Sequence, residues 1–451
     1  MPLASVRGMT PRFHTAALVL ALLAAGAPLS GAPAFVQARL DADYPSLESL
    51  YRDLHAHPEL SLQEEKTGAR LAAELRAAGF EATEKFGGTG VVGVLKNGPG
   101  PTLLIRSDMD ALPVKEETGL AFASTVRMEN LSGQDVPVMH ACGHDAHMTI
   151  LVGTARMLAA LRDKWSGTVV LIGQPAEEIG VGARNMLTAG LFRQFPRPDF
   201  AIGLHDDPAI PAGSVGFCDG SFSSNADAVK IDVRGIGGHG ARPDNAKDPV
   251  VLAAQIVLAL QTIVSREIHP GEKAVVTVGS INGGTAPNII PDSVKLQLTL
   301  RSYSDDVRQH LVASVRRICQ GEALAAGMPE DRMPVVTVTE SGSADSIYND
   351  PKLTARVRSA VTGSLGASNV LSVEPMMASE DFSQYGRTVE HVPVCFFLVG
   401  ASDPAKLGES RRTGMPLPAL HSSKFAPDAE PMIRTGVAAM AAATLDLLPK
   451  G

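Results

Sequence analysis

The sequence has few cysteines, with only four in 451 residues: Cys142, Cys218, Cys319 and Cys395. Their wide spacing does not match the dense cysteine pattern of small disulfide-stapled domains, so no disulfide framework is expected. Basic clusters are also missing, and the formal net charge is -8. Nucleic acid is therefore not expected as a partner, because phosphate binding requires a concentrated positive surface. Without low-complexity tracts, the chain is expected to be globular.

Long hydrophobic runs are scarce as well, and the one we find lies near the N-terminus, at residues 16–27. It follows Arg7 and Arg12 and precedes small residues with an Ala-Pro-Ala cleavage site at 32–34, which is typical of a secretory signal peptide. We expect residues 1–34 to be removed near Ala34 and the protein to be exported to the periplasm. The run is short for a membrane span and no second one follows, so stable membrane insertion is not expected after cleavage. An uncleaved anchor is the alternative.

A chain of this length exceeds the size at which one hydrophobic core usually stops growing, so two domains are expected. After two amphipathic helices within residues 44–80, short apolar runs alternate with helical patterns. The apolar runs are Gly90–Leu95, Thr102–Ile105, Thr168–Ile172 and Phe200–Leu204, and the main helix is Ala146–Leu161. This alternation predicts an α/β domain, residues 40–225, with a largely parallel sheet covered by helices.

The pattern changes at residue 226 and follows the order β-α-β-β-α-β up to residue 340. The expected strands are Ala228–Val233, Ala274–Ile281, Ser293–Arg301 and Pro334–Val338, and the helices are Pro249–Val264 and Asp305–Ala326. This order is that of a ferredoxin-like α+β unit, which can close its own small sheet, so we predict an inserted second domain. Residues 341–451 return to the first pattern, with a helix at 350–362, a strand at 392–399 and a terminal helix at 428–448. The first domain is thus predicted to be discontinuous.

Metal-ligand residues concentrate in the segment Met139–His147, directly before the predicted helix. It holds three histidines, a cysteine and an aspartate, each a good ligand for zinc- or manganese-like ions. Two alternatives stay open. The histidines could cap the helix with Cys142 as a small core residue, or Cys142 could be the metal-free nucleophile of a Cys-His hydrolase.

Three other motifs follow predicted strands, at Arg106–Asp110, Gln174–Glu178 and Gly203–His205. Because ligand sites of open α/β sheets form beyond the carboxyl ends of the strands, these side chains are expected to converge. His421, just ahead of the terminal helix, is a further candidate. Taken singly, each motif could also be a surface loop, a pair of solvated acids or a structural histidine.

The adjacent Glu177 and Glu178 are expected to take different roles, because side chains diverge once the chain leaves the sheet. Glu178 fits a metal ligand and Glu177 a general base. A hydroxide bridged between two cations is a strong nucleophile at neutral pH, and a nearby carboxylate can pass its proton to the leaving amine.

Four strings closely resemble one family: Arg-Ser-Asp-Met-Asp-Ala-Leu-Pro at 106–113, Met-His-Ala-Cys-Gly-His-Asp at 139–145, Gln-Pro-Ala-Glu-Glu at 174–178 and Gly-Leu-His at 203–205. It is the co-catalytic metallopeptidase family of aminoacylases and carboxypeptidases, in the amidohydrolase branch with hippurate hydrolase and the auxin-conjugate (IAA-amino acid) hydrolases. The strings Leu54–Leu60 and Ser379–Phe382 also match. The likeness runs from about Leu47 to Leu448.

The resemblance implies two divalent metal ions per subunit, which could be manganese, zinc, cobalt or nickel. The implied ligands are Cys142, His144, Glu178, His205 and His421, with Cys142 bridging the ions and Glu177 as general base. Asp108 and Asp145 are implied to orient the ligands through hydrogen bonds. Asp206 and Asp207 depart from the family pattern by adding negative charge near the metals.

The resemblance also implies that the insert is a lid and dimerisation domain, which makes a homodimer the expected state. His239, in the glycine-rich loop 237–243, is implied to stabilise the oxyanion, often in the active site of the partner subunit. Asn288 and Arg301 are implied to hold the substrate. The alternatives are an exposed turn for His239 and a structural salt bridge for Arg301.

The expected activity is hydrolysis of hippurate-like N-acyl amino acids to a carboxylic acid and a free amino acid, through a metal-bound hydroxide. A dipeptidase or aminopeptidase on the same metal centre is one alternative. The other is a periplasmic binding protein that captures an acyl-amino acid without cleaving it. A pure binder would have no need for a base at Glu177.

Overall fold

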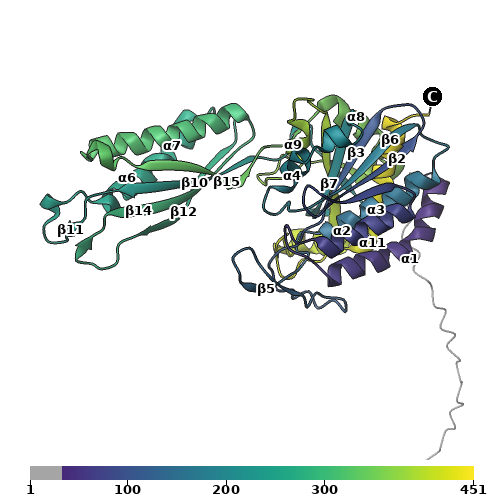
Figure 1. The fold of residues 1–451 in the computed structure, drawn as a ribbon, viewed down its shortest axis with the longest axis horizontal. Coiled ribbons are helices and arrows are strands. Elements are labelled where there is room, and N and C mark those ends of the chain that lie inside the picture. The colour runs from purple at the N-terminus through teal and green to yellow at the C-terminus, as the bar shows by residue number, and fades with distance from the viewer. Residues whose placement is uncertain (1–32, 451) are drawn as a thin grey trace, which may run out of the picture.

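The computed structural model describes residues 33–450, which form a large body and a smaller insert that projects from it (Figure 1). The predicted signal peptide lies almost entirely outside the described residues. The body is built on an eight-stranded sheet in the order β1-β2-β6-β3-β7-β18-β8-β17. Its strands are β1 (Glu81–Phe86), β2 (Gly90–Asn97), β3 (Thr102–Asp108), β6 (Gly167–Gln174), β7 (Phe200–Pro211), β8 (Val215–Phe217), β17 (Val370–Ser372) and β18 (Val394–Ser402).

The four central strands β6, β3, β7 and β18 run parallel, whereas β1 and β2 are antiparallel at one edge. Side chains alternate between two cores. In β3, Leu103 and Ile105 face one core and Leu104 faces the other, and all three are fully buried. Such continuous apolar strands are characteristic of a parallel sheet that is covered on both faces. The predicted α/β class with a largely parallel sheet is confirmed.

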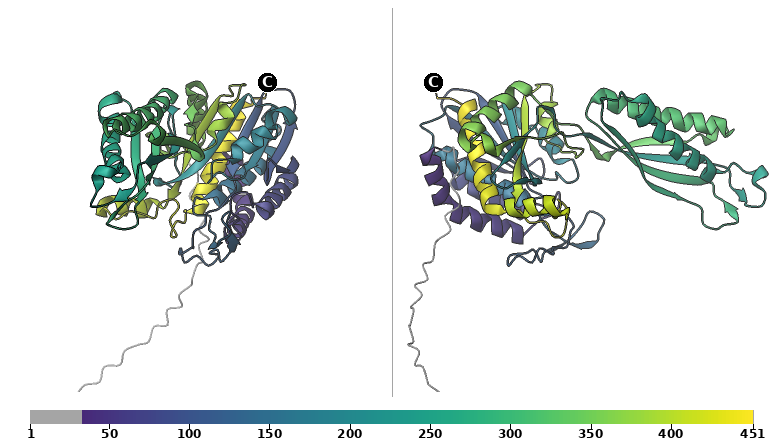
Figure 2. Two further views of the ribbon diagram at one scale, coloured as in Figure 1. Left: turned by 60° about the vertical axis from the view of Figure 1, so that its left-hand side comes forward. Right: turned by 180° about the vertical axis from the view of Figure 1, so that it is seen from behind.

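Helices cover both faces of the body's sheet (Figures 1 and 2). One core contains the helices α1 (Ala34–Ala56), α2 (Glu65–Ala77), α3 (His144–Ala160), α8 (Pro351–Leu365) and α11 (Ala429–Leu447). The opposite core contains the short helices α4 (Gly182–Thr188), α5 (Leu191–Gln194) and α9 (Ser383–Gly386). Outside these layers lie a hairpin of β4 (Arg127–Glu129) and β5 (Asp135–Pro137), and α10 (Pro404–Thr413).

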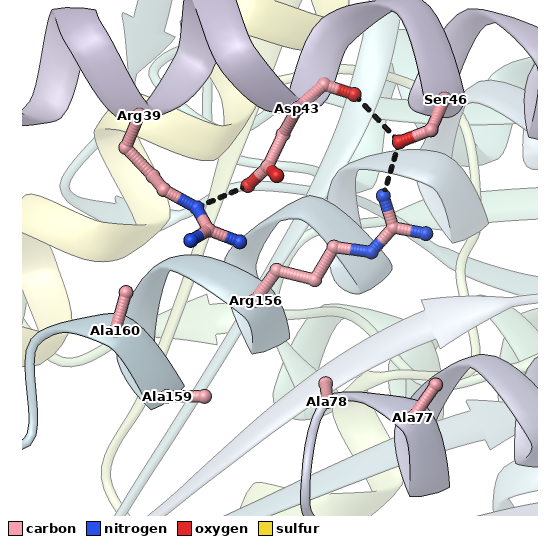
Figure 3. Close-up of a pocket in the computed structure, with 8 residues that line it drawn as sticks. All are labelled: Arg39, Asp43, Ser46, Ala77, Ala78, Arg156, Ala159 and Ala160. Atoms are coloured by element: carbon pink, nitrogen blue, oxygen red, sulfur yellow. Dashed lines mark hydrogen bonds and ion pairs between the residues drawn. The ribbon is translucent and has the colours of Figure 1, made fainter.

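Helix α1 is fastened to its neighbours by polar contacts around a surface hollow (Figure 3). Arg156 of α3 donates to Ser46 Oγ of α1 at 2.7 Å and to Glu74 of α2 at 2.7 Å. None of the residues predicted to take part in catalysis or metal binding lines this hollow. Its contacts instead fix the course of α1 across α3.

The insert has a four-stranded antiparallel sheet in the order β12-β14-β10-β15, with two helices on one face. Its elements are β10 (Asn225–Arg234), α6 (Pro249–Thr262), β12 (Ala274–Gly283), β14 (Ser293–Ser302), α7 (Asp305–Ala325) and β15 (Val335–Ala344). This is the predicted β-α-β-β-α-β order, although β15 continues past residue 340, where we expected the insert to end. The chain enters and leaves the insert at adjacent points, where Ser346 N donates to Asn225 Oδ1 at 2.7 Å.

The expectation that only the N-terminus carries a long apolar run is wrong. Pro249–Glu267, which comprises α6 and a following π-helical turn, is also long and apolar enough to span a membrane. One side of this helix packs on the sheet of the insert through Leu252, Ile256 and Leu260. Its length and composition are thus explained in part by the core of the insert.

Candidate metal centre

The predicted motifs meet at one edge of the central sheet. In the parallel register, Asp108 at the end of β3 pairs with Gln174 at the end of β6, and Arg106 pairs with Gly203 of β7. The segment that carries Cys142 and His144 leads into α3 at the same edge. His421 comes from the loop before α11, and its N–H donates to Ala141 O at 2.7 Å.

Each of the five predicted ligands has a donor atom within 4.0 Å of a donor atom of another one. Cys142 Sγ is 3.4 Å from His205 Nε2 and 3.3 Å from His421 Nε2. Glu178 closes the group, with one oxygen 3.5 Å from His421 Nε2 and the other 4.0 Å from His144 Nε2. Side chains separated by up to 279 positions therefore form a single cluster.

The donor atoms of this cluster fit divalent metal ions. His144 Nε2 and Glu178 Oε1 are buried and have no hydrogen-bond partner among the described residues. Buried polar atoms in native proteins are normally paired, so two such atoms that face each other fit a site at which a metal ion binds. One thiol, three imidazoles and one carboxylate make up a mixed set that suits zinc, manganese, cobalt or nickel.

The ring orientation of two of the histidines predicted to be ligands is fixed by backbone carbonyls. His144 Nδ1 lies 2.8 Å from Asp110 O, and His205 Nδ1 lies 2.8 Å from Asp206 O. When each Nδ1 carries the proton and donates it, Nε2 presents its lone pair to the cluster. This is the tautomer that a metal ion needs.

The environment of Cys142 does not suit a metal-free nucleophile. Burial raises the pKa of its thiol well above the ordinary value, and the nearby Glu178, Asp206 and Glu177 raise it further. A catalytic cysteine instead needs a lowered pKa and a positively charged neighbour. The Cys-His hydrolase is therefore disfavoured.

Asp110 shapes the turn that carries Glu177 and Glu178. Its two carboxylate oxygens accept the N–H groups of Glu177 at 3.1 Å and Glu178 at 3.0 Å, and Ser61 Oγ donates to it at 2.6 Å. Ala176, just before the pair, has a left-handed φ of 52°. The two side chains lie in different groups, Glu178 with Cys142 and His144, and Glu177 with Glu380 and Asp381. We did not assign Asp110 a role from the sequence, although it belongs to the string at 106–113.

Glu177 lies beside a second group of carboxylates. Its carboxylate and those of Glu380 and Asp381 lie within 4.8 Å of one another, and Arg106 donates to Glu380 at 2.7 Å. Burial raises the pKa of Glu177 well above its ordinary value, and Glu380, Glu178 and Asp381 add to the shift. A carboxylate with a raised pKa is a stronger proton acceptor than an ordinary one, which suits a general base.

The two aspartates that we expected to orient ligands have other direct partners. Asp108 pairs with Arg106 at 2.7 Å and with His147 Nδ1 at 2.8 Å, and it is 3.7 Å from His144 Nε2. Asp145 pairs with His55 Nδ1 at 2.6 Å. Both carboxylates are buried.

Arg301 shares one cavity of about 580 Å³ with Glu177 and four of the five predicted ligands. Cys142, Glu177, Glu178, His205 and His421 line it on one side. The guanidinium of Arg301 donates to Ser379 Oγ at 3.3 Å and forms no ion pair with a described carboxylate. Apolar side chains complete the wall, namely Ile179, Met376, Phe396 and Leu420.

His239 and Asn288 lie far from this cavity within one chain. They belong to the tip of the insert, near β11 (Gly238–His239) and β13 (Ile289–Ile290), at the end remote from the body (Figure 1). Gly240 N donates to Asn288 O at 2.8 Å, so the two residues share one loop cluster. His239 is exposed, and its Nδ1 accepts Ala241 N at 3.1 Å.

The sequence model of peptidase family M20/M25/M40 matches residues 104–412. The chain belongs to this family. Hippurate hydrolase of Campylobacter jejuni is 36% identical over 337 residues, which cover 74% of this chain and 83% of the relative. N-acetyldiaminopimelate deacetylase of Leuconostoc citreum is 34% identical over 378 residues, which cover 83% of this chain and 92% of the relative. The resemblance seen in the sequence is thus confirmed.

A solved structure of an M20 family member leads to the same conclusion. This Bacillus subtilis protein, described as a dinuclear metal binding peptidase, superposes with a TM-score of 0.71 at 29% identity. The match covers 90% of this chain and 100% of that one. As a member of the M20/M25/M40 family, the chain is a hydrolase that acts on amide bonds.

Proposed function

We propose that this protein is a metal-dependent amidohydrolase that cleaves N-acyl amino acids to a carboxylic acid and a free amino acid. The observation that carries the proposal is the cluster of five proposed ligands beside the half-buried Glu177, with Cys142, Glu178, His205 and His421 lining one cavity with Arg301. The relatives named as a hippurate hydrolase and a deacetylase support this reaction class.

Each residue of the proposed site then has a defined task. Cys142, His144, Glu178, His205 and His421 would hold two divalent ions, which polarise the amide carbonyl and lower the pKa of water. Glu177 takes the proton from the attacking water and returns it to the leaving amine. Arg301, the only arginine or lysine among the described residues that line the cavity, binds the substrate carboxylate.

A substrate panel tests this assignment. We expect hydrolysis of hippurate and N-acetyl amino acids, and much slower hydrolysis of the matching C-terminal amides, which lack the carboxylate. Arg301→Gln should raise KM for the free acids by roughly 10- to 100-fold, the cost of a lost charged hydrogen bond, and change KM for the amides little. Equal turnover of acids and amides by the wild type would contradict the role of Arg301.

A dipeptidase or aminopeptidase activity on the same centre is the second candidate, favoured by the Bacillus subtilis structure described as a peptidase. The same panel separates the two. A peptidase of this kind would cleave dipeptides with a free N-terminus faster than their N-acetylated counterparts, whereas an amidohydrolase would prefer the blocked forms.

We also propose that the protein is a homodimer joined through the insert, in which His239 serves the cavity of the partner subunit. The edge strand β12 and one side of α6 expose large apolar residues, namely Val250, Val251, Leu258 and Ile281. A second copy that pairs there would cover them. His239, exposed at the far tip of the insert, would then be free to reach the other subunit.

Subunit mixing tests the role of His239. The variants His239→Ala and Glu177→Gln are each expected to be nearly inactive, the former by about 100- to 1,000-fold, as is typical for loss of an oxyanion donor. When equal amounts are exchanged into mixed dimers, one complete site per mixed dimer should restore about a quarter of wild-type activity. If verified mixed dimers were no more active than the mean of the two parent variants, the proposal would be contradicted.

A further inference from the structure

His55 is a buried histidine at the C-terminal turn of α1 that the proposed chemistry leaves without a task. Its ring is 1% exposed, and each nitrogen faces a carboxylate. Nδ1 lies 2.6 Å from Asp145 Oδ2, and Nε2 lies 3.0 Å from Glu116 Oε1. Burial alone would lower the pKa of His55, but the hydrogen bonds to Asp145 and Glu116 raise it to about 10. The side chain is therefore an imidazolium that holds two buried anions together.

The first of these anions, Asp145, is the sequence neighbour of the proposed metal ligand His144. Asp145 follows His144 in the first turn of α3, and its other oxygen accepts Ala146 N at 2.9 Å. The bond to His55 therefore fixes the turn that presents His144 to the cluster.

The second anion, Glu116, is connected through its loop to the segment that carries another proposed ligand, His421. Glu116 is held by Thr118 Oγ1 and by Ser124 N at 2.5 Å, so its loop is tightly folded around His55. The next residue, Glu117, donates its N–H to Ser423 O at 2.7 Å and accepts Ser423 Oγ at 3.1 Å. Ser423 is two residues beyond His421.

His421 depends more on such support than the other ligands do. Its side chain is 55% exposed, whereas that of His144 is fully buried and that of His205 is 13% exposed. Its backbone has a left-handed φ of 65°, a strained conformation for a histidine that persists only when the surroundings enforce it. The contacts of Ala141 with His421 and of Glu117 with Ser423 hold His421 in this conformation.

We propose that His55 is a positioning residue that ties His144, through Asp145, and His421, through Glu116 and Glu117, into one metal centre. The inference rests on the proposed metal-dependent function and extends it to a residue outside the cavity. Without the imidazolium, the buried carboxylates of Asp145 and Glu116 lose their shared counter-charge and repel each other. The His421 segment, which is the more exposed, moves first, so the ion that His421 helps to bind is lost first.

The experiment compares His55→Gln with His57→Gln. His57 lies two residues further on in the same sequence motif, but its side chain is 71% exposed, and it contacts the backbone carbonyl and the carboxylate of Asp53. Binding of Mn²⁺ and Co²⁺ to the metal-free full chain is measured by calorimetry and chelator competition, without substrate. The absorption of the Co²⁺ form reports on ligation by the Cys142 thiolate.

In His55→Gln, one of the two ions should bind at least 30-fold more weakly and the other less than 5-fold more weakly. In His57→Gln, both should bind as in the wild type. Added Mn²⁺ should restore activity to His55→Gln, which a merely misfolded protein would not show. Wild-type affinity for both ions in His55→Gln, or an equal loss of both, overturns the proposal.

Glu116→Gln keeps the test decisive if His55→Gln does not fold. This variant removes only the carboxylate that connects His55 to the His421 segment, and it leaves the imidazolium paired with Asp145. It should weaken the binding of the same ion by at least 10-fold. A folded Glu116→Gln that binds both ions with wild-type affinity overturns the proposal. If the wild type itself binds fewer than two ions, the proposed metal centre fails, which is a separate outcome from failure of the role of His55.

Discussion

Glu177→Gln should lower kcat by roughly 100- to 10,000-fold, the usual contribution of general acid–base catalysis, while the protein keeps its full metal content. The amide of glutamine cannot take a proton from water, but it has nearly the same size as the carboxylate. The turn that holds residue 177 should persist, because Asp110 binds the backbone of that turn and not its side chains. The measurement is kcat with hippurate or an N-acetyl amino acid, together with metal analysis of the same sample.

The neighbouring residue provides the matched control. Glu178→Gln changes the same chemical group one position further on, but we expect it to lose bound metal as well as activity. If Glu177→Gln retained more than a tenth of wild-type kcat, the role of Glu177 as base would be refuted. If it lost metal like Glu178→Gln, the division of roles between the two glutamates would be wrong.

Removal of metal by dialysis against a chelator should reduce activity at least 1,000-fold, and one or more of Mn²⁺, Zn²⁺, Co²⁺ and Ni²⁺ should restore it. Water and the amide carbonyl are poor reactants at neutral pH unless a cation activates them. The same treatment should lower the melting temperature, because ions that bind only the folded state stabilise it by mass action. Metal-free protein that remains fully active would contradict the proposed function.

A pair of cysteine variants shows whether metal binding and activity depend specifically on this cluster. Cys142→Ser should weaken metal binding and activity together. Cys218→Ser replaces another buried cysteine, whose sulfur contacts Ser221 O and lies outside the ligand cluster, and should leave metal binding unchanged. Equal metal affinity in the two variants would exclude Cys142 as a ligand.

The sequence was sufficient to predict that the candidate ligands lie close together, for a simple physical reason. Parallel strands carry their carboxyl ends to the same edge, so motifs that directly follow apolar runs must lie near one another whatever the length of chain between them. Residues 106, 174 and 203 obey this rule, and the register of β3 with β6 and β7 shows it directly. Periodicity also gave the order of elements in the insert.

The supporting contacts could not be predicted, because they depend on loop conformations and not on periodicity. Ser423 meets Glu117 across 306 positions, and neither residue belongs to a repeating pattern. Asp110 could have been noticed within its motif, but its role depends on the left-handed turn at Ala176. The short strands β8 and β17 complete the sheet beside β18, yet each has three residues, too few to show a pattern.

The position of β18 between β7 and β8 determines when the catalytic centre can form during synthesis. Until residues 394–402 are made, the sheet has a gap in its interior, and His421 follows them by another 19 positions. The insert, whose chain segment is continuous, can fold earlier around its own core. The five proposed ligands can therefore be brought together only in a nearly finished polypeptide, so truncated products are expected to lack hydrolytic activity.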